Sequence, residues 1–80
     1  MFVRTKHFVY QISVNRNEFM VKTVEGDYYT DRRDHISVGT QFAGSKLYLK
    51  IGGALSLSGK DGTFKTSRVL EISKTRPKFK

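Results

Sequence analysis

The strongest constraint on the fold is the alternation of polar and apolar residues in short runs. The stretch KLYLKI (46–51) places Lys46, Tyr48 and Lys50 on one side, and two leucines and an isoleucine on the other. Successive side chains of a β-strand point to opposite faces of a sheet, so this pattern predicts a half-buried strand. The stretch HFVYQISV (7–14) alternates in the same way, with its aromatic and aliphatic residues predicted to face a core. We find no convincing helical pattern, so an all-β fold is expected.

Turn-forming residues divide the chain into short segments. Asparagine- or glycine-containing turns are predicted at NRN (15–17), EGD (25–27), AGS (43–45), GG (52–53) and GKDG (59–62). The strands predicted between them cover residues 7–14, 18–24, 46–51, 54–58 and 63–72, with shorter extended pieces at 28–30 and 36–42. In the last strand the apolar positions change phase between Phe64 and Val69. A bulge or an edge twist near Thr66 and Ser67 would reconcile them.

These segments predict a small antiparallel barrel of five to six strands. An SH3-like barrel is favoured over an OB-like one, because the OB type usually carries a helix between its third and fourth strands and no amphipathic segment here is long enough. A single domain is expected over residues 1–73. The tail KTRPKFK (74–80) contains four cations and a proline, so we expect it to be mobile.

Composition indicates where such a chain would work. It has no cysteine, so disulfides and thiolate metal sites are excluded, and a reducing compartment is the natural reading. The N-terminal residues are not followed by the apolar stretch of a signal peptide. No apolar run approaches the roughly 18 residues that a membrane span requires. A soluble, cytoplasmic protein without a membrane partner is therefore expected.

Charge is the strongest signal for a partner. Fifteen lysines and arginines against seven acids give a net charge of +8. Residues 1–39 carry a net charge of +1, from six cations and five acids, whereas residues 40–80 carry +7, from nine cations and two acids. Such a field attracts polyanions and speeds their encounter with the protein. Solubility alone is the competing explanation.

Enzymatic activity is not expected. The chain lacks a nucleophile motif and a phosphate-cradling loop. The acidic stretch DRRDH (31–35) could hold a divalent cation, but a solvated loop whose acids pair with Arg32 and Arg33 explains it better. We therefore predict no catalytic residue, no metal site and no cofactor.

The polar side of KLYLKI is the best candidate binding surface. Proteins that hold single-stranded nucleic acid combine cations that follow the phosphates with aromatic rings on which bases stack. Lys46, Tyr48 and Lys50 supply both on one strand face. Tyr28 and Tyr29 are adjacent, so only one can face the core, and Tyr29 is the further candidate for stacking. The other candidates are cations beside it, in the 59–62 turn, on the last predicted strand and in the tail: Arg32, Arg33, Lys60, Lys65, Arg68, Lys74, Arg76 and Lys78. In the alternative interpretation Tyr48 is an ordinary exposed cross-strand partner, and the lysines protect an edge strand from aggregation.

The sequence thus predicts a barrel that binds nucleic acid, with DNA and RNA both open. The alternative is a small protein-binding module, of the kind that phages and plasmids encode, that docks on an acidic host protein. Its basic face would then steer the encounter, and Tyr48 would be an anchor.

Overall fold

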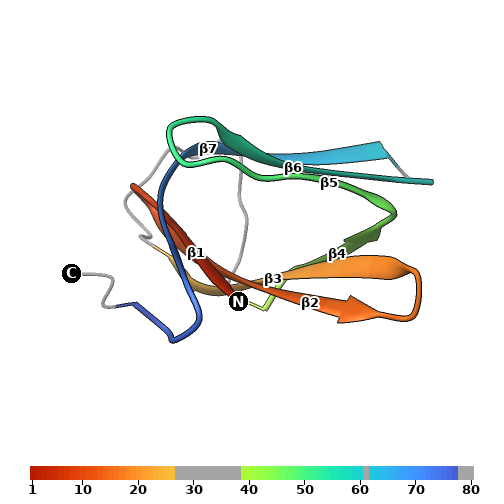
Figure 1. Ribbon diagram of the computed structural model, residues 1–80, viewed down its shortest axis with the longest axis horizontal. Helices are drawn as coiled ribbons and strands as arrows, with labels where there is room; N and C mark the ends of the chain where they lie inside the picture. Colours follow the sequence, from red (N-terminus) through yellow and green to blue (C-terminus); the bar gives the residue numbers. More distant parts are fainter. Residues whose placement is uncertain (27–38, 61, 78–80) are drawn as a thin grey trace.

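The computed structural model describes residues 1–26, 39–60 and 62–77. These residues form seven strands: β1 (Phe2–Thr5), β2 (Phe8–Asn15), β3 (Glu18–Gly26), β4 (Gln41–Gly44), β5 (Lys46–Tyr48), β6 (Ala54–Gly59) and β7 (Gly62–Ser73) (Figure 1). Within the same described ranges, no helix is long and apolar enough to cross a membrane. The predicted all-β class is confirmed.

All the strands pair in antiparallel fashion in one curled sheet. Their order is β4-β3-β2-β1-β7-β6-β5, so each pairing joins neighbours along the chain except β1 with β7. In Figure 1, β5, β6 and the start of β7 form one layer, and β1 to β4 form the other. Strand β7 is long enough to run from the first layer into the second, so the sheet curls into a half-barrel.

The chain crosses from one edge of the sheet to the other between β4 and β5. Strand β4 pairs with β3, whereas β5 pairs with β6 after a break of one residue. At this corner the Ser45 amide donates a hydrogen bond to the Ser58 carbonyl at 2.9 Å. Gly44 is buried against the Ser58 carbonyl, where a Cβ atom would collide with the backbone. The corner therefore needs a residue without a side chain.

The core fills the space between the two layers. Its buried members are Val3, Tyr10, Ile12, Val21, Leu55, Leu57 and Val69. Aromatic rings connect the layers: Tyr10 of β2 lies 5.7 Å from Phe64 of β7, and Phe64 lies 5.8 Å from Phe42 of β4, between ring centroids. The half-buried leucines of the 46–51 segment, Leu47 and Leu49, pack against this cluster. Burial of these side chains is the main stabilising contribution that a chain of this size can make.

Three irregularities in strand register produce the curl. On β7, three steps from Lys65 to Arg68 oppose two on β6, so an extra residue lies at Thr66–Ser67, as the apolar phase change predicted. A second extra residue on β7, Leu70, lies opposite the step from Arg4 to Thr5 of β1. The third is Val24 on β3. Bulges bend a strand and increase its twist, which a half-barrel of short strands requires.

Several details differ from the sequence prediction. The prediction did not include β1, and it gave five or six strands where the described residues form seven. Strand β5 ends at Tyr48 rather than at residue 51, so Ile51 is 58% exposed instead of facing the core. Val14, at the end of β2, is also exposed. The piece predicted at 36–42 overlaps β4 only at residues 41–42, and its residues 36–38 lie outside the described residues, as does the piece at 28–30.

Candidate nucleic-acid interface

The outer face of β5, β6 and β7 carries the residues on which the sequence prediction centred. Lys46 pairs with Ser58, and Tyr48 pairs with Ser56. Ser56 in turn pairs with Lys65 of β7. Paired residues point to the same face of a sheet, so Tyr48 and Lys65 lie on one face about 10 Å apart, two strand spacings. The inward residues between them, Leu55 and Leu57, are fully buried, which fixes this orientation.

The bulge at Thr66–Ser67 adds Arg68 to this face. Lys65 and Arg68 are three residues apart, so in a regular strand they would point in opposite directions. Here Lys65 pairs with Ser56 and Arg68 pairs with Ala54, and both partners lie on the outward side of β6. The Thr66 hydroxyl oxygen accepts a hydrogen bond from the Leu55 amide at 3.1 Å, which ties the bulge to β6. The structure thus brings together Lys46, Tyr48, Lys65 and Arg68, which we call the β5–β7 face.

Small polar residues cover the area between the cations. Ser56 and Ser58 of β6 are half-buried, and the Ser58 and Thr63 hydroxyl oxygens lie 3.2 Å apart in a hydrogen bond. Tyr48, by contrast, is 58% exposed and stands above this low surface. An exposed ring beside short side chains can be covered by a flat ligand.

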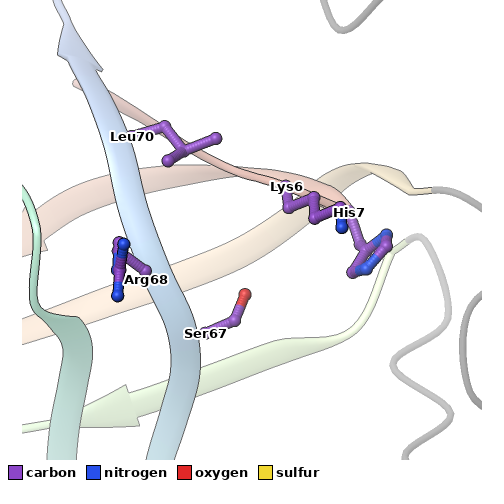
Figure 2. A pocket seen from close by; sticks show the side chains of 5 residues that line it. All are labelled: Lys6, His7, Ser67, Arg68 and Leu70. Carbon is purple, nitrogen blue, oxygen red and sulfur yellow. The ribbon is translucent and has the colours of Figure 1, made fainter.

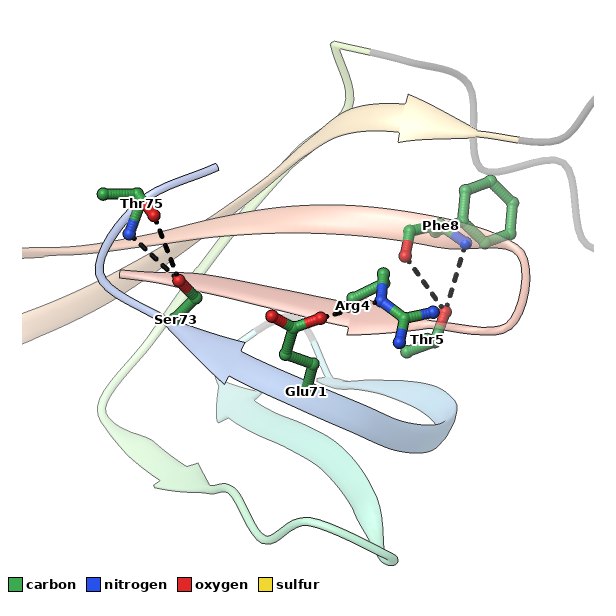
Figure 3. A network of polar contacts seen from close by, with 6 residues as sticks. All are labelled: Arg4, Thr5, Phe8, Glu71, Ser73 and Thr75. Carbon is green, nitrogen blue, oxygen red and sulfur yellow. Dashed lines mark hydrogen bonds and ion pairs between the residues drawn. The ribbon is translucent and has the colours of Figure 1, made fainter. Parts of the chain in front are cut away.

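The charges on the β5–β7 face are available to a ligand. Its lysines and its arginine are all exposed, and no ion pair joins them to an acid of the described ranges. Two other arginines are engaged. Arg4 donates to Glu71 at 3.1 Å (Figure 3), and Arg76 lies 3.3 Å from a Glu25 carboxylate oxygen.

Two further predicted cations lie at the margins of the β5–β7 face. Lys50 is exposed in the turn after β5, where its carbonyl accepts a hydrogen bond from the Gly53 amide at 3.0 Å. Lys60 is exposed at the tip of the β6–β7 hairpin, beside the Gly59–Gly62 pair. Both extend the positive surface beyond the strands.

The C-terminal candidates are not part of the β5–β7 face. Arg76 donates a hydrogen bond to the Val24 carbonyl at 3.1 Å as well as contacting Glu25, so its charge is directed toward β3. Lys74 is exposed, and it lies within a short turn in which the Thr75 amide donates to the Ser73 hydroxyl oxygen at 3.1 Å (Figure 3). The mobility of the tail stays a prediction. Four candidates lie outside the described residues: Tyr29, Arg32, Arg33 and Lys78. The acidic stretch at 31–35 lies there too.

The sequence analysis missed a pocket beside Arg68. It is open, has a volume of about 400 Å³ and is lined by Lys6, His7, Ser67, Arg68 and Leu70 (Figure 2). The pairing of β1 with β7 brings Lys6 and His7 to this place from the other end of the chain. Local sequence patterns do not encode that pairing, so no signal in the sequence indicated it.

Among the described residues, the titratable group with a shifted pKa lies away from this face and this pocket. Tyr10 is buried in the core, and burial raises the pKa of its phenol well above the ordinary value, although a hydrogen bond with the Thr5 side chain partly opposes this effect. Within the described ranges, no group of three or more histidines and acids is placed to hold a metal ion.

Comparisons with known proteins do not place the chain in a family. No protein-family model, curated protein sequence or solved structure matches it.

Proposed function

We propose that this protein binds nucleic acid on the β5–β7 face. The observation that carries the proposal is the strand register, which puts Lys46, Tyr48, Lys65 and Arg68 on one exposed surface without a described acid among them. Cations at this spacing neutralise phosphates, and base–aromatic stacking contributes about 1–3 kcal/mol per base.

Single-stranded nucleic acid suits this surface best. The bases of a duplex are already stacked on one another, so an exposed tyrosine offers them little, whereas the bases of a single strand are free to cover a ring. Tyr48 would accept a base, and Lys46 and Lys65 would contact the phosphates on either side. The small residues between them, Ser56 and Ser58, leave room for the backbone to lie close to the sheet.

We also infer that the half-barrel is of the SH3-like type. Its strands pair with their neighbours along the chain, and the pairing of β1 with β7 joins the two ends. The OB type is a Greek-key barrel, in which a connection skips over strands. The observed order of strands supports the SH3-like type.

One observation favours the alternative function, a module that docks on an acidic protein. Ile51 lies three residues after Tyr48, and each is 58% exposed. An aromatic and an aliphatic side chain surrounded by cations form the kind of anchor that protein interfaces use. Phosphate binding does not require Ile51.

A titration with labelled oligonucleotides tests the proposal. Fluorescence anisotropy with mixed-sequence single-stranded DNA, single-stranded RNA and duplex DNA should show binding that is tighter for the single strands. Tyr48→Ala should weaken this binding by about 1–3 kcal/mol, because a stacked base is lost. Tyr48→Phe is the matched control, since it keeps the ring and should bind as the parent does.

The same titration separates the two functions. If no oligonucleotide binds at low salt, the nucleic-acid proposal is wrong and the protein-docking alternative takes its place. If oligonucleotides bind but Tyr48→Ala binds them as tightly as Tyr48→Phe does, the proposed stacking of a base on Tyr48 is wrong.

A further inference from the structure

Two cations, Lys6 and Arg68, line one pocket near the junction of β1 and β7. Arg4 pairs with Glu71 and Thr5 pairs with Val69, so Lys6, which follows β1, and Arg68, which precedes Val69, come next on the two sides of this junction. Both Lys6 and Arg68 line the open pocket (Figure 2). The neighbouring Arg4–Glu71 pair is matched in sign and bonded at 3.1 Å, whereas no described acid lines the pocket beside Lys6 and Arg68.

The backbone around these cations is well fixed. The buried Thr5 hydroxyl accepts a hydrogen bond from the Phe8 amide at 3.2 Å and lies 3.3 Å from the Phe8 carbonyl, to which it donates (Figure 3). These bonds close the Lys6–His7 turn. On the opposite side, Arg68 lies between the two bulges of β7. The backbone that carries each cation is therefore held by hydrogen bonds or strand pairing.

The other lining residues suit a phosphate with an organic group attached. Ser67 offers a hydroxyl that can donate to a phosphate oxygen, and lysine and arginine are the usual phosphate partners. Leu70 is 43% exposed, because the bulge turns it away from the core, and it supplies an apolar wall. The volume of about 400 Å³ falls within the range of small-molecule sites. The described residues that line the pocket include no acid.

We propose that this pocket binds the phosphate group of a nucleotide between Lys6 and Arg68, with the sugar or base against Leu70. The inference rests on the proposed function and deepens it, since Arg68 belongs to both the pocket and the β5–β7 face. A strand that crosses the β5–β7 face would place one phosphate in the pocket. That phosphate is either a terminal monoester or an interior diester.

Amide chemical-shift mapping by NMR tests the pocket directly. A nucleoside 5′-monophosphate, the same nucleoside without phosphate, and inorganic phosphate are each titrated into the whole protein. The monophosphate should give saturable shifts at residues 6–8 and 67–70, and the nucleoside should give none there. Inorganic phosphate should shift the same amides with weaker affinity, because it makes no contact with Leu70. The proposal is wrong if the monophosphate shifts none of these amides, or if the monophosphate and the nucleoside shift them equally.

Two variants identify the groups responsible. Lys6→Gln should weaken monophosphate binding by about tenfold or more, as expected for loss of a charge-assisted hydrogen bond. Lys22→Gln removes the same charge from an exposed position on β3 and is the matched control. Leu70→Ala should weaken binding of the monophosphate but not of inorganic phosphate. Equal effects of Lys6→Gln and Lys22→Gln contradict the role of Lys6.

Oligonucleotides with 5′-phosphate and 5′-hydroxyl ends identify the source of the phosphate. A preference for the 5′-phosphate that disappears in Lys6→Gln indicates a terminal monoester. Equal binding of both, weakened equally by Lys6→Gln, indicates an interior diester. Oligonucleotide binding that Lys6→Gln leaves unchanged overturns the pocket while the β5–β7 face stands. Monophosphate binding without any oligonucleotide binding overturns the proposed function while the pocket stands.

Discussion

The two described tyrosines show how position decides the chemistry of one residue type. Tyr48 stands on the outer face of β5 and is 58% exposed, whereas Tyr10 is 1% exposed in the core. An exposed phenol ring offers a stacking surface, while a buried one contributes apolar area and ring contacts at 5.9 Å with Phe8 and 5.7 Å with Phe64. The alternation of both strands predicted these orientations.

Because the phenol of Tyr10 is buried, the protein should lose stability at alkaline pH. Burial raises the pKa of Tyr10 in the folded state above the ordinary value of about 10 that it has in the unfolded chain. Above about pH 10 the unfolded state releases this proton and the folded state keeps it, so the free energy of unfolding falls by up to about 1.4 kcal/mol per pH unit. Below that pH the group is neutral in both states and has no such effect.

Chemical denaturation at pH values from 8 to about 11.5 measures this effect. Tyr10→Phe cannot ionise, so its stability should fall less steeply than that of the parent. Tyr48→Phe is the control and should follow the parent. A parent and a Tyr10→Phe variant that lose stability in parallel would show that Tyr10 does not ionise on unfolding.

A second prediction at this scale compares two aliphatic residues. Leu57 is fully buried between Leu47 and Phe64, so Leu57→Ala should lower the free energy of unfolding by about 2–5 kcal/mol. Ile51 is exposed beyond the end of β5, so Ile51→Ala should change it by less than about 0.5 kcal/mol. Denaturant titration measures both. The alternation in KLYLKI (46–51) predicted that Ile51 faces the core. A large decrease in the free energy of unfolding for Ile51→Ala would support that prediction and contradict the exposed position of Ile51.

At the scale of elements, the sequence predicted the strands and the bulge that depend on the spacing of residues close together in the chain. Strands β2, β3, β6 and β7 were predicted close to their observed positions, because alternating or β-forming residues fill them and turn-forming residues separate them. The bulge at Thr66–Ser67 was found from a phase change for the same reason. The sequence pattern did not predict the second bulge, at Leu70, as a distinct irregularity.

Other elements depend on pairings between distant parts of the chain. Strand β1 has only four residues, two of them polar, and it is held by β2 and by β7, nearly 70 residues away. The end of β5 at Tyr48 is likewise set by tertiary contacts, since the Gly52 amide donates to the Val69 carbonyl at 2.9 Å. A periodic pattern contains no information about such contacts. The pocket at Lys6 was missed for the same reason.

The corner between β4 and β5 gives a prediction for two glycines. A Cβ at Gly59 would lie 2.6 Å from the Ala43 carbonyl oxygen, and one at Gly44 would collide with the Ser58 carbonyl. Gly44→Ala and Gly59→Ala should each lower the free energy of unfolding by about 1–3 kcal/mol, because the strands must separate. Gly53→Ala is the control, since its Cβ would meet atoms at ordinary contact distances of 3.7 and 3.8 Å. Thermal or denaturant unfolding compares the three, and equal stability would mean that the corner is not closely packed.

At the scale of the whole molecule, the uneven charge found in the sequence has a structural counterpart. Glu25 and Glu71, two of the described acids, are engaged by Arg76 and Arg4 on the part of the sheet formed by β1, β3 and the end of β7. The β5–β7 face keeps its cations unmatched by any acid of the described ranges. Unmatched positive charge on this face can attract a polyanion.

The salt dependence of oligonucleotide binding tests this account most directly. With four to six phosphates neutralised, a plot of log affinity against log salt should have a slope of about −3 to −4 for a single strand. Combining Lys46→Gln with Lys65→Gln should flatten the slope by about one to two, while combining Arg16→Gln with Lys22→Gln, on the β2–β3 hairpin of the other layer, should leave it unchanged. A parent slope near zero, or equal flattening by the two double variants, would contradict the claim that the β5–β7 face binds nucleic acid.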